Sequence, residues 1–211
     1  MNTDYPIETR TLIENVLNLG DVNEPEINSR WLNYFQDSLL QDVISAVDSQ
    51  YVDMTDISQL MYKTFKRLGR AIPHIPVPEI YTQIGAFNQS VVIGDGLIGI
   101  SLDKYLGSDF ALYAKYYDEQ QRSTMTREYI VPDCVSFYLL SYYPAPLGQN
   151  EQETLKLKAV HMGKVMWVVN KLMDNHTFQT VYVDRVEQFM KTHKKMSIRQ
   201  LMELEDDKLM G

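Results

Sequence analysis

Cysteine is almost absent from this chain, and long apolar runs are missing altogether. The only cysteine is Cys134, which excludes a disulfide framework and a zinc site built from several cysteines. The longest apolar stretches, around Val135–Tyr143 and Val165–Val169, fall well short of the roughly 20 residues that a membrane-spanning helix needs. Met1–Pro6 has neither the basic start nor the apolar segment of a signal peptide. The sequence therefore predicts a soluble chain without a targeting segment.

An excess of basic residues is missing as well. The 211 residues include 20 lysines and arginines against 28 aspartates and glutamates, which gives a formal net charge of −8. Proteins that bind nucleic acids usually carry a basic stripe, so the charge predicts no nucleic-acid partner. Tyrosine is abundant by contrast, with 14 copies against 7 phenylalanines and 2 tryptophans. Its apolar ring and polar tip suit surfaces that bind another molecule.

The first third of the chain shows the periodicity of helices. Apolar residues form stripes at helical spacing over Leu12–Leu19, Trp31–Val47 and Ile57–Leu68. Gly20 follows the first stripe and Gly69 the third. Glycine is the residue that most easily adopts the left-handed conformation at the end of a helix, so both glycines predict helix ends.

The middle of the chain changes to the pattern of strands. Pro73, Pro76 and Pro78 exclude a helix, and short β-branched runs follow them. Asp95-Gly96 is the strongest short signal for a hairpin with a type I′ turn, in which both central residues take positive φ. We therefore predict a small antiparallel sheet from the runs Ile80–Ile84, Ser90–Ile93 and Leu97–Leu102.

Helical patterns return after the sheet. A helix that contains Pro132 in its first turn is expected to end at Pro144. The next predicted helix contains Gly163 and, four residues later, Trp167. Gly163 predicts the close approach of another element. The buried stripe of that helix is predicted to consist of Leu155, Ala159, Met162, Met166, Val169 and Met173.

Two later segments resemble capping boxes, and together the patterns define a fold class. Asp184-x-x-Glu187 and Ser197-x-x-Gln200 each predict the start of a helix. The fold expected is α+β in a single domain, residues 1–211, predominantly helical with a small central antiparallel sheet. Its helical parts are residues 1–72 and 109–211, and its short strands lie within residues 75–103.

The sequence contains one literal G-x-G-x-x-G motif, over Gly94–Gly99. In a dinucleotide-binding fold, such a motif connects a strand to a helix whose N-terminus holds the pyrophosphate. Here the motif is followed by Ile100-Ser101-Leu102, a run that continues a strand. The motif is therefore interpreted as part of a hairpin, without a dinucleotide cofactor.

Motifs for metal binding and nucleophilic catalysis are also missing. There is no H-E-x-x-H and no G-x-S-x-G. Cys134 is expected to be a buried apolar side chain, because its neighbour Asp133 disfavours a thiolate. Asp118 and Glu119 are adjacent and diverge on a helix, so we expect both to face solvent. The histidines are scattered, and two of them, His161 and His193, are expected at the boundary of the core; the four are His74, His161, His176 and His193.

Five segments in a fixed order resemble the gliding motility-associated lipoprotein B (GldB) family of the Bacteroidetes. They are Pro76–Tyr81, Ile98–Gly107 with its Leu-Asp-x-Tyr-Leu-Gly sequence, the tyrosine-rich Tyr113–Tyr117, Tyr129–Asp133 and Gly163-Lys164. The resemblance extends over about two thirds of the chain. The family-like residues singled out are Pro78, Tyr81, Leu102, Asp103, Tyr105, Leu106, Gly107, Pro132, Asp133, Gly163 and Lys164.

The local physics of one of these segments can also be predicted. Leu102 and Leu106 are four residues apart and are expected to face inward, so that Asp103 and Lys104 point elsewhere. Asp103 is well placed to accept hydrogen bonds from backbone N–H groups in a turn, and Gly107 permits a left-handed exit. A structural role is therefore favoured over a catalytic one for Asp103.

The resemblance implies a cell-envelope lipoprotein on the periplasmic side. It would be tethered to the membrane through a lipidated N-terminal cysteine, which is not present in this chain. The resemblance also implies an outline similar to zincin-like metallopeptidases that have lost the zinc motif. The chain is expected to end before the C-terminal segment that family members usually carry.

Three functions remain open from the sequence. The first is a non-enzymatic envelope component that binds or scaffolds other envelope proteins and needs no cofactor. The second is a zincin-derived metal-dependent hydrolase with ligands drawn from His161, His176 or His193. The third is a module that binds a glycan or a peptidoglycan fragment through its tyrosines.

Overall fold

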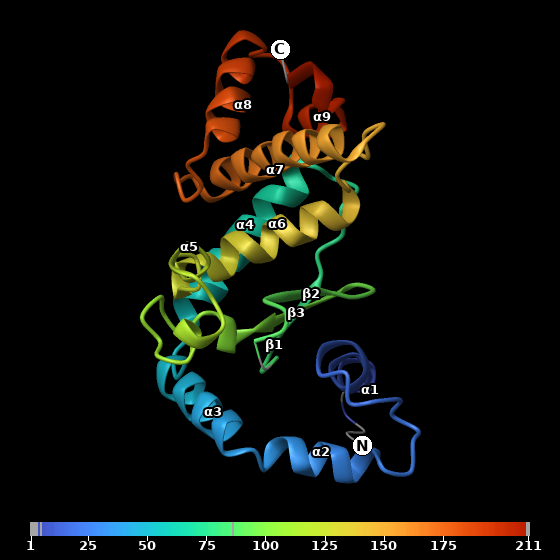
Figure 1. Ribbon diagram of the computed structural model, residues 1–211. Coiled ribbons are helices and arrows are strands. Elements are labelled where there is room, and N and C mark those ends of the chain that lie inside the picture. Colours follow the sequence, from blue (N-terminus) through green and yellow to red (C-terminus); the bar gives the residue numbers. More distant parts are fainter. Residues whose placement is uncertain (1–3, 5, 86, 210–211) are drawn as a thin grey trace. The chain divides into compact units, whose positions relative to one another are not determined.

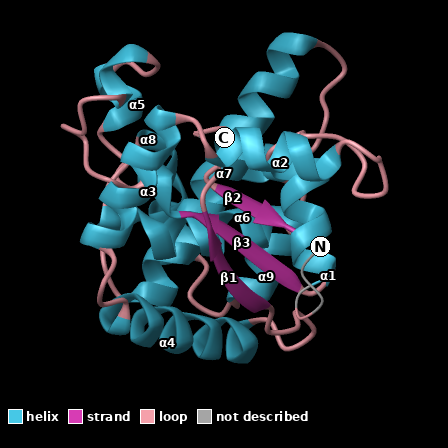
Figure 2. Ribbon diagram, turned by 90° about the horizontal axis from the view of Figure 1, so that it is seen from below, coloured by secondary structure: helices cyan, strands magenta, loops and turns pink. Residues whose placement is uncertain are grey.

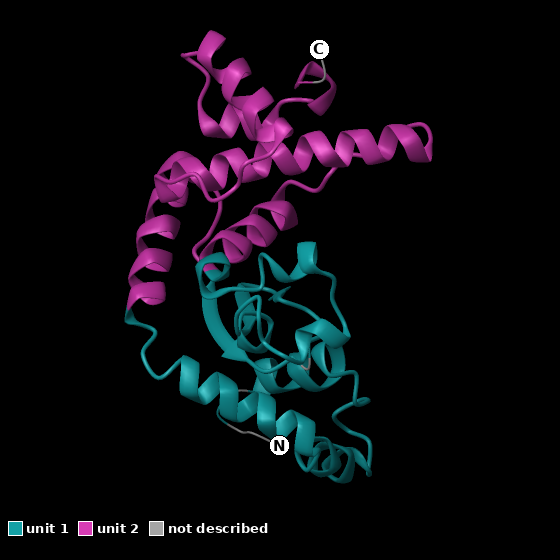
Figure 3. Ribbon diagram, turned by 60° about the vertical axis from the view of Figure 1, so that its left-hand side comes forward, with its two compact units in different colours: residues 1–55, 78–130 teal, residues 56–77, 131–211 magenta. Residues whose placement is uncertain are grey.

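The computed structural model describes residue 4, residues 6–85 and residues 87–209, which divide into two compact units. Unit 1 combines residues 1–55 with 78–130, and unit 2 combines residues 56–77 with 131–211 (Figure 3). The single domain expected for residues 1–211 stays a prediction, and each unit is described by itself. Most of Met1–Pro6, the segment without signal-peptide features, lies outside the described residues.

Unit 1 begins with helices that are shorter than the apolar stripes suggest. The stripe over Trp31–Val47 is divided between two helices, because Asp37 adopts an extended conformation and its carboxylate caps the second one by accepting from the Leu40 backbone N–H at 2.9 Å. Gly20 has φ +125°, which confirms the left-handed position predicted for it. The elements are α1 (Pro6–Arg10), the π-helical η1 (Thr11–Val16), α2 (Ile27–Phe35) and α3 (Ser38–Gln50) (Figure 1).

The sheet of unit 1 has the order β1-β3-β2 and is mixed (Figure 2). Strands β2 (Val91–Ile93) and β3 (Leu97–Ser101) form the predicted antiparallel hairpin. Strand β1 (Glu79–Gln83) pairs with β3 in parallel, so the prediction of a purely antiparallel sheet is wrong. β3 is the central strand and every one of its residues is buried, which is typical of a strand covered on both faces. The α+β, mostly helical class is confirmed.

The turn between β2 and β3 differs from the predicted type. The hairpin closes with a hydrogen bond from the Gly94 N–H to the Leu97 carbonyl at 2.9 Å. Gly96 has φ +72°, but Asp95 does not have positive φ. A type I′ turn needs positive φ at both central residues, so that detail is wrong. The reading of Gly94–Gly99 as a hairpin without a dinucleotide-binding helix is confirmed.

Short helices complete unit 1 after the sheet. Asp118 opens one of them through a capping box with Gln121, whose backbone N–H donates to the Asp118 carboxylate at 2.7 Å. Asp118 and its neighbour Glu119 are both exposed, as predicted. The helices are η2 (Leu102–Lys104), η3 (Tyr113–Lys115), α5 (Glu119–Arg122) and η4 (Arg127–Tyr129).

Unit 2 is built from helices joined by loops, with no strand among its described residues. Pro132 lies in the first turn of α6 and the helix ends before Pro144, as predicted. Ser197 and Gln200 form the predicted capping box, but Asp184 does not begin a helix, because Thr180 caps that helix instead. The elements are α4 (Thr55–Ala71), α6 (Ile130–Tyr142), α7 (Glu151–Met173), α8 (Val181–Thr192), α9 (Ile198–Glu203) and η5 (Asp206–Leu209). The first residues of α4 and α6, Thr55 and Ile130, belong to unit 1.

The longest helix, α7, is the centre of unit 2. From Val160 onward nearly every residue is buried, including the polar side chains of His161, Lys164 and Asn170. The predicted apolar stripe is therefore only partly right: Val169 and Met173 are buried, but Leu155 is 61% exposed. A helix packed by neighbours on several sides buries more than one stripe, so periodicity alone misplaces its face.

No helix among the described residues is both long and apolar enough to cross a membrane.

Replacing Gly163 with alanine should destabilise unit 2. A Cβ added at Gly163 would lie 2.3 Å from the Tyr182 Cβ and 2.9 Å from the Tyr182 carbonyl carbon, which are atoms that cannot yield without moving α8. Overpacking of this kind costs about 1–3 kcal/mol or more. The close approach predicted at this glycine is thus present, with α8 as the neighbour.

Gly69 in α4 provides the matched control. A Cβ at Gly69 has no neighbour within 4 Å, so Gly69→Ala should stabilise the protein by about 0.5–1 kcal/mol through helix propensity. Urea unfolding monitored by circular dichroism measures both changes. Equal effects of the two substitutions would contradict the close packing at Gly163.

Candidate functional site

The structure divides the family-like residues between the two units. Unit 1 holds Pro78, which is buried before β1, Tyr81 within β1, and the segment Leu102–Gly107 that follows β3. The Tyr81 hydroxyl donates to a Glu79 carboxylate oxygen at 2.7 Å. Unit 2 holds Pro132, Asp133, Gly163 and Lys164, the first two in the first turn of α6 and the last two in the middle of α7.

Asp103 holds a loop of unit 1 in place. Its side chain is completely buried, and its two carboxylate oxygens accept the backbone N–H groups of Gly85 at 2.8 Å and of Phe87 at 2.7 Å. Burial raises the pKa of Asp103, and the two N–H bonds only partly counteract it. The prediction that Asp103 accepts backbone hydrogen bonds is confirmed. Asp103 nevertheless is as buried as the two leucines from which it was expected to point away.

Tyrosine hydroxyl groups satisfy the backbone of the same segment. The Tyr113 hydroxyl donates to the Asp103 carbonyl and accepts from the Leu106 N–H at 2.9 Å. The Tyr105 carbonyl accepts from the Tyr51 hydroxyl at 2.5 Å. Leu102, Tyr105 and Leu106 are buried and Gly107 has φ +115°, so the inward leucines and the left-handed glycine are confirmed.

Phe87 has an unusual backbone conformation, which hydrogen bonds from nearby side chains support. Its φ of +63° is one of three positive values at non-glycine positions among the described residues, and this conformation costs about 1–2 kcal/mol in L-residues. Its carbonyl accepts from the Tyr117 hydroxyl at 2.7 Å and from the Lys104 ammonium at 3.3 Å. The Lys104 ammonium also lies 4.2 Å from the centre of the Tyr117 ring. Nothing in the sequence distinguishes Phe87, because its conformation depends on partners 16 to 30 residues away.

Phe87 borders a cavity of about 1010 Å³ within unit 1. Most of the wall is apolar or aromatic, and it comes from α2, α3, the loop before β2 and the residues around η3. Burial raises the pKa of Tyr34, one of the wall residues, to about 12, so its hydroxyl keeps its proton. The lining residues are Asn18, Leu19, Arg30, Asn33, Tyr34, Asp37, Leu39, Leu40, Val43, Phe87, Tyr116 and Tyr117.

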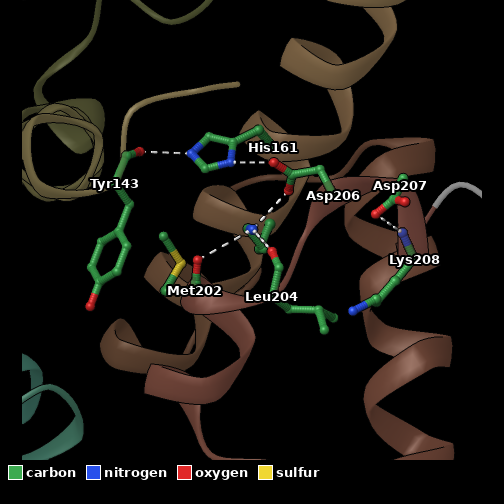
Figure 4. A network of polar contacts seen from close by, with 8 residues as sticks. Tyr143, His161, Met202, Leu204, Asp206, Asp207 and Lys208 are labelled. Carbon is green, nitrogen blue, oxygen red and sulfur yellow. Dashed lines mark hydrogen bonds and ion pairs between the residues drawn. The ribbon is translucent and has the colours of Figure 1, made fainter. Parts of the chain in front are cut away.

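Unit 2 contains a second cluster, in which His161 and Lys164 of α7 meet Asp206 of η5 (Figure 4). The His161 Nδ1 atom is 2.9 Å from one Asp206 carboxylate oxygen, and the Lys164 ammonium is 2.7 Å from the other. Lys164 also donates to the carbonyl of Leu204 at 2.8 Å. All three charged or polar side chains are at least 95% buried. The prediction of His161 at the boundary of the core is therefore wrong.

Both ring nitrogens of His161 lie against oxygen atoms of the protein. Its Nε2 atom lies 2.8 Å from the Tyr143 carbonyl, and its Nδ1 atom lies 2.9 Å from the Asp206 carboxylate. Neither nitrogen is therefore open to a metal ion or to a substrate in this arrangement.

A cavity of about 550 Å³ borders this cluster. A histidine oriented by an aspartate is typical of general bases in hydrolases. Here the nitrogen that would face a substrate is bound to the Tyr143 carbonyl, and the described residues that line the cavity include no serine, cysteine or threonine. The arrangement holds η5 against α7, and the carboxylates of Glu153, Glu203, Glu205 and Asp207 also line the cavity.

The remaining candidate residues lie apart from both clusters. Cys134 is fully buried, and burial raises the pKa of its thiol, so the predicted apolar role agrees with its position. His193 is exposed and stacks on Phe189 with ring centres 4.0 Å apart. His176 is exposed on the segment between α7 and α8. Among residues 4, 6–85 and 87–209, no three His, Cys, Asp or Glu side chains are placed to hold a metal ion.

The stabilisation contributed by Asp206 should be lost in acid. Burial raises the pKa of Asp206, but the His161 hydrogen bond and the charges of Lys164 and His161 outweigh burial and hold that pKa below its ordinary value of 3.8. A carboxylate with a lowered pKa stabilises the folded state fully above the unfolded value and loses this effect as pH falls through the folded value. The difference in unfolding free energy between wild type and Asp206→Asn should therefore be constant near neutral pH and shrink below pH 3.8.

Urea unfolding of both proteins in steps from about pH 7 to about pH 2 measures this difference. Taking the difference removes the titration of all other carboxylates that the two proteins share. A difference that stays constant across the whole range would contradict the ion pairing of Asp206.

Comparison with known proteins gives one match. A family model described as "Gliding motility protein GldB" matches residues 1–182 of the chain. No curated protein matches, and no solved structure matches. The match covers the sheet, the Leu102–Gly107 segment, α6 and α7, and it confirms the resemblance found in the sequence. The chain belongs to the GldB family of gliding motility lipoproteins.

Proposed function

We propose that this protein is a non-catalytic component of the bacterial cell envelope, where it binds or scaffolds other envelope proteins. The family supports the association with gliding motility and with a lipid anchor. Placement on the periplasmic side, in a bacterium of the Bacteroidetes, is part of the proposal. Attachment to the membrane through a lipid anchor, as the family's name suggests, is also part of the proposal.

The observation that carries the proposal is the use of the charged family-like residues inside the fold. Asp103 bonds the N–H groups of Gly85 and Phe87, and Lys164 bonds Asp206 and the Leu204 carbonyl. A catalytic acid or base needs to reach the proton it transfers, whereas these groups are enclosed by protein partners. Residues used in this way stabilise a scaffold, and the surfaces left for function are binding surfaces.

A second candidate is the binding of a glycan or a peptidoglycan fragment. Tyr34, Phe87, Tyr116 and Tyr117 line the cavity of unit 1, and aromatic rings provide flat apolar surfaces with polar edges. A hydrolase is supported less well, because the described part of the chain places no group of three metal ligands together.

The test is made in the bacterium that encodes the protein. Deletion of the gene should impair gliding or envelope integrity, and the full-length protein should restore it. A photo-crosslinking residue placed at exposed positions of each unit should capture defined envelope proteins. Unchanged envelope behaviour together with no captured envelope protein would overturn the proposal.

Elemental analysis of the purified protein tests the hydrolase alternative. Protein purified without added metal should contain no stoichiometric zinc. Stoichiometric zinc that disappears in His161→Ala would reverse the ranking, because the imidazole would then be a ligand rather than a donor to Asp206 and Tyr143.

A further inference from the structure

One residue that lines the cavity of unit 1 has a strained backbone conformation. Phe87 contributes its ring to the wall and has φ +63°. Asp103, Lys104 and Tyr117 bond the Phe87 backbone and hold it in this conformation. Strained residues persist only where the surroundings impose them, and they concentrate at binding sites. The family-like Asp103 thus supports a residue of the cavity wall.

Aromatic contacts fix the direction of the Phe87 ring. Its centre lies 5.5 Å from that of Tyr113, 6.1 Å from that of Tyr116 and 6.5 Å from that of Phe110. Tyr116 is 58% exposed, and Leu39 on α3 is 37% exposed. The cavity therefore has a rigid aromatic wall and exposed apolar side chains, the combination that binding sites for apolar groups use.

The charged groups of the wall are already bound within unit 1. Arg30 forms an ion pair with Glu24 at 2.7 Å and donates to the Leu19 carbonyl at 2.9 Å. The Asp37 carboxylate caps the N-terminus of α3. These two groups are thus engaged within the unit, which favours a ligand whose part in the cavity is uncharged.

The charge of unit 1 as a whole is strongly negative. Its residues include 17 aspartates and glutamates against 6 lysines and arginines, a net charge of −11, while unit 2 has 11 against 14 and a net charge of +3. Residues 21–53, which contain α2 and α3, have seven acidic residues, and Arg30 is the only basic one. Two of the seven, Asp42 and Asp48, lie within α3, α2 has none, and the other five lie in the segments beside the helices. A partner that approaches this stretch should therefore carry positive charge, because complementary charge steers and orients association.

We propose that the cavity of unit 1 docks an apolar segment of a partner protein flanked by lysine or arginine residues. The inference rests on the proposed binding function and specifies the chemistry of the partner. The apolar side chains enter between Phe87, Tyr116 and Leu39, and the basic flanks face the acidic side chains of residues 21–53. An anionic lipid surface or an anionic glycan is repelled by the same charge.

A labelled peptide tests the proposal on the full chain. The probe is a short fluorescein-labelled peptide with two lysines at each end of a leucine, alanine and phenylalanine stretch. One control peptide has glutamates in place of the lysines, and another has serines in place of the leucines and phenylalanines. Fluorescence anisotropy at low and high salt measures binding. We expect the basic apolar peptide to bind at least about tenfold more tightly than either control, with weaker binding at high salt.

Variants place the binding at the cavity. Tyr116→Ala and Leu39→Asp change exposed residues of the wall and should weaken binding at least about tenfold. Tyr62→Ala removes a tyrosine that is 68% exposed in unit 2 and should leave binding unchanged. Circular dichroism confirms that each variant is folded.

The outcomes separate the possible occupants. Equal binding of the lysine and glutamate peptides, or binding that Tyr116→Ala and Leu39→Asp do not weaken, overturns the proposal. Displacement of bound probe by a neutral glycan or a fatty acid at lower concentration than by unlabelled peptide also overturns it and identifies another ligand class. If the peptide fails but photo-crosslinking still captures envelope proteins, the proposed function stands and only the cavity is excluded as its site.

Discussion

Replacing Asp206 with asparagine should lower the free energy of unfolding by about 3–5 kcal/mol. The substitution keeps the size of the side chain and removes its negative charge. Lys164 is 1% exposed and lies 2.7 Å from the carboxylate, so its ammonium would lose the one opposite charge of the cluster. A buried charge without its partner is among the most costly defects in a folded protein.

Two further variants show whether charge is the cause. Asp207→Asn changes the exposed neighbour of Asp206 on η5 and should alter stability by less than about 0.5 kcal/mol. Lys164→Met should cost less than Asp206→Asn, because it removes the buried ammonium itself and the Asp206 carboxylate would keep its contact with the His161 ring. Urea unfolding of the three variants gives the order. A Lys164→Met variant less stable than Asp206→Asn would contradict the charge assignment of the cluster.

Replacing Asp103 with alanine should lower the free energy of unfolding by about 2–4 kcal/mol. The N–H groups of Gly85 and Phe87 would lose the carboxylate that accepts both of them. An unsatisfied buried donor costs about 1–3 kcal/mol, and the strained backbone of Phe87 would lose one of its supports. We also expect the amides of Gly85 and Phe87 to exchange hydrogen faster with solvent, which nuclear magnetic resonance measures residue by residue.

Asp103→Asn and Asp109→Ala are the controls for this prediction. The asparagine keeps one acceptor oxygen and should cost less than the alanine. Asp109 is exposed, and no hydrogen bond of its side chain is present in the described part of unit 1, so its replacement should have little effect. Protection of Gly85 and Phe87 that survives in Asp103→Ala would show that other contacts hold the loop.

The two aspartates differ in the sign of their response to pH. Burial raises the pKa of Asp103, whereas the His161 and Lys164 contacts lower that of Asp206 despite its burial. Their neighbours explain the difference: Asp103 is bound by neutral N–H groups, and Asp206 lies between the His161 ring and the Lys164 ammonium. Acid therefore weakens the contribution of Asp206 and does not weaken that of Asp103 in the same way.

Local sequence patterns were sufficient for much of the fold. Proline placed the end of α6 correctly before Pro144. The glycines were less accurate, because η1 already ends at Val16, before Gly20, and α4 continues past Gly69 to Ala71. The hairpin over Gly94–Gly99 was predictable because a tight turn depends on its own residues. The split at Asp37 was missed because a single capping side chain interrupts an apolar stripe that continues on both sides.

The sites were predictable only in part. Asp103 was recognised as a structural acceptor, since an aspartate in a turn is well placed to accept nearby backbone N–H groups. Its actual donors, Gly85 and Phe87, lie 18 and 16 residues away. His161 and Lys164 are three residues apart on α7, which places them on one side of the helix. Asp206, whose carboxylate contacts both of these side chains, is 45 residues from His161.

By itself, the sequence determined the family, the mostly helical α+β class and the absence of known catalytic motifs, because each of these depends on residue types and short spacings. The tertiary structure decided that β1 runs parallel to β3, that His161 is buried against Asp206, and that Phe87 lines a cavity. These features arise from contacts between residues far apart in the chain. Burial sets the cost of every unpaired charge or N–H group, and only the folded chain shows which partners satisfy them.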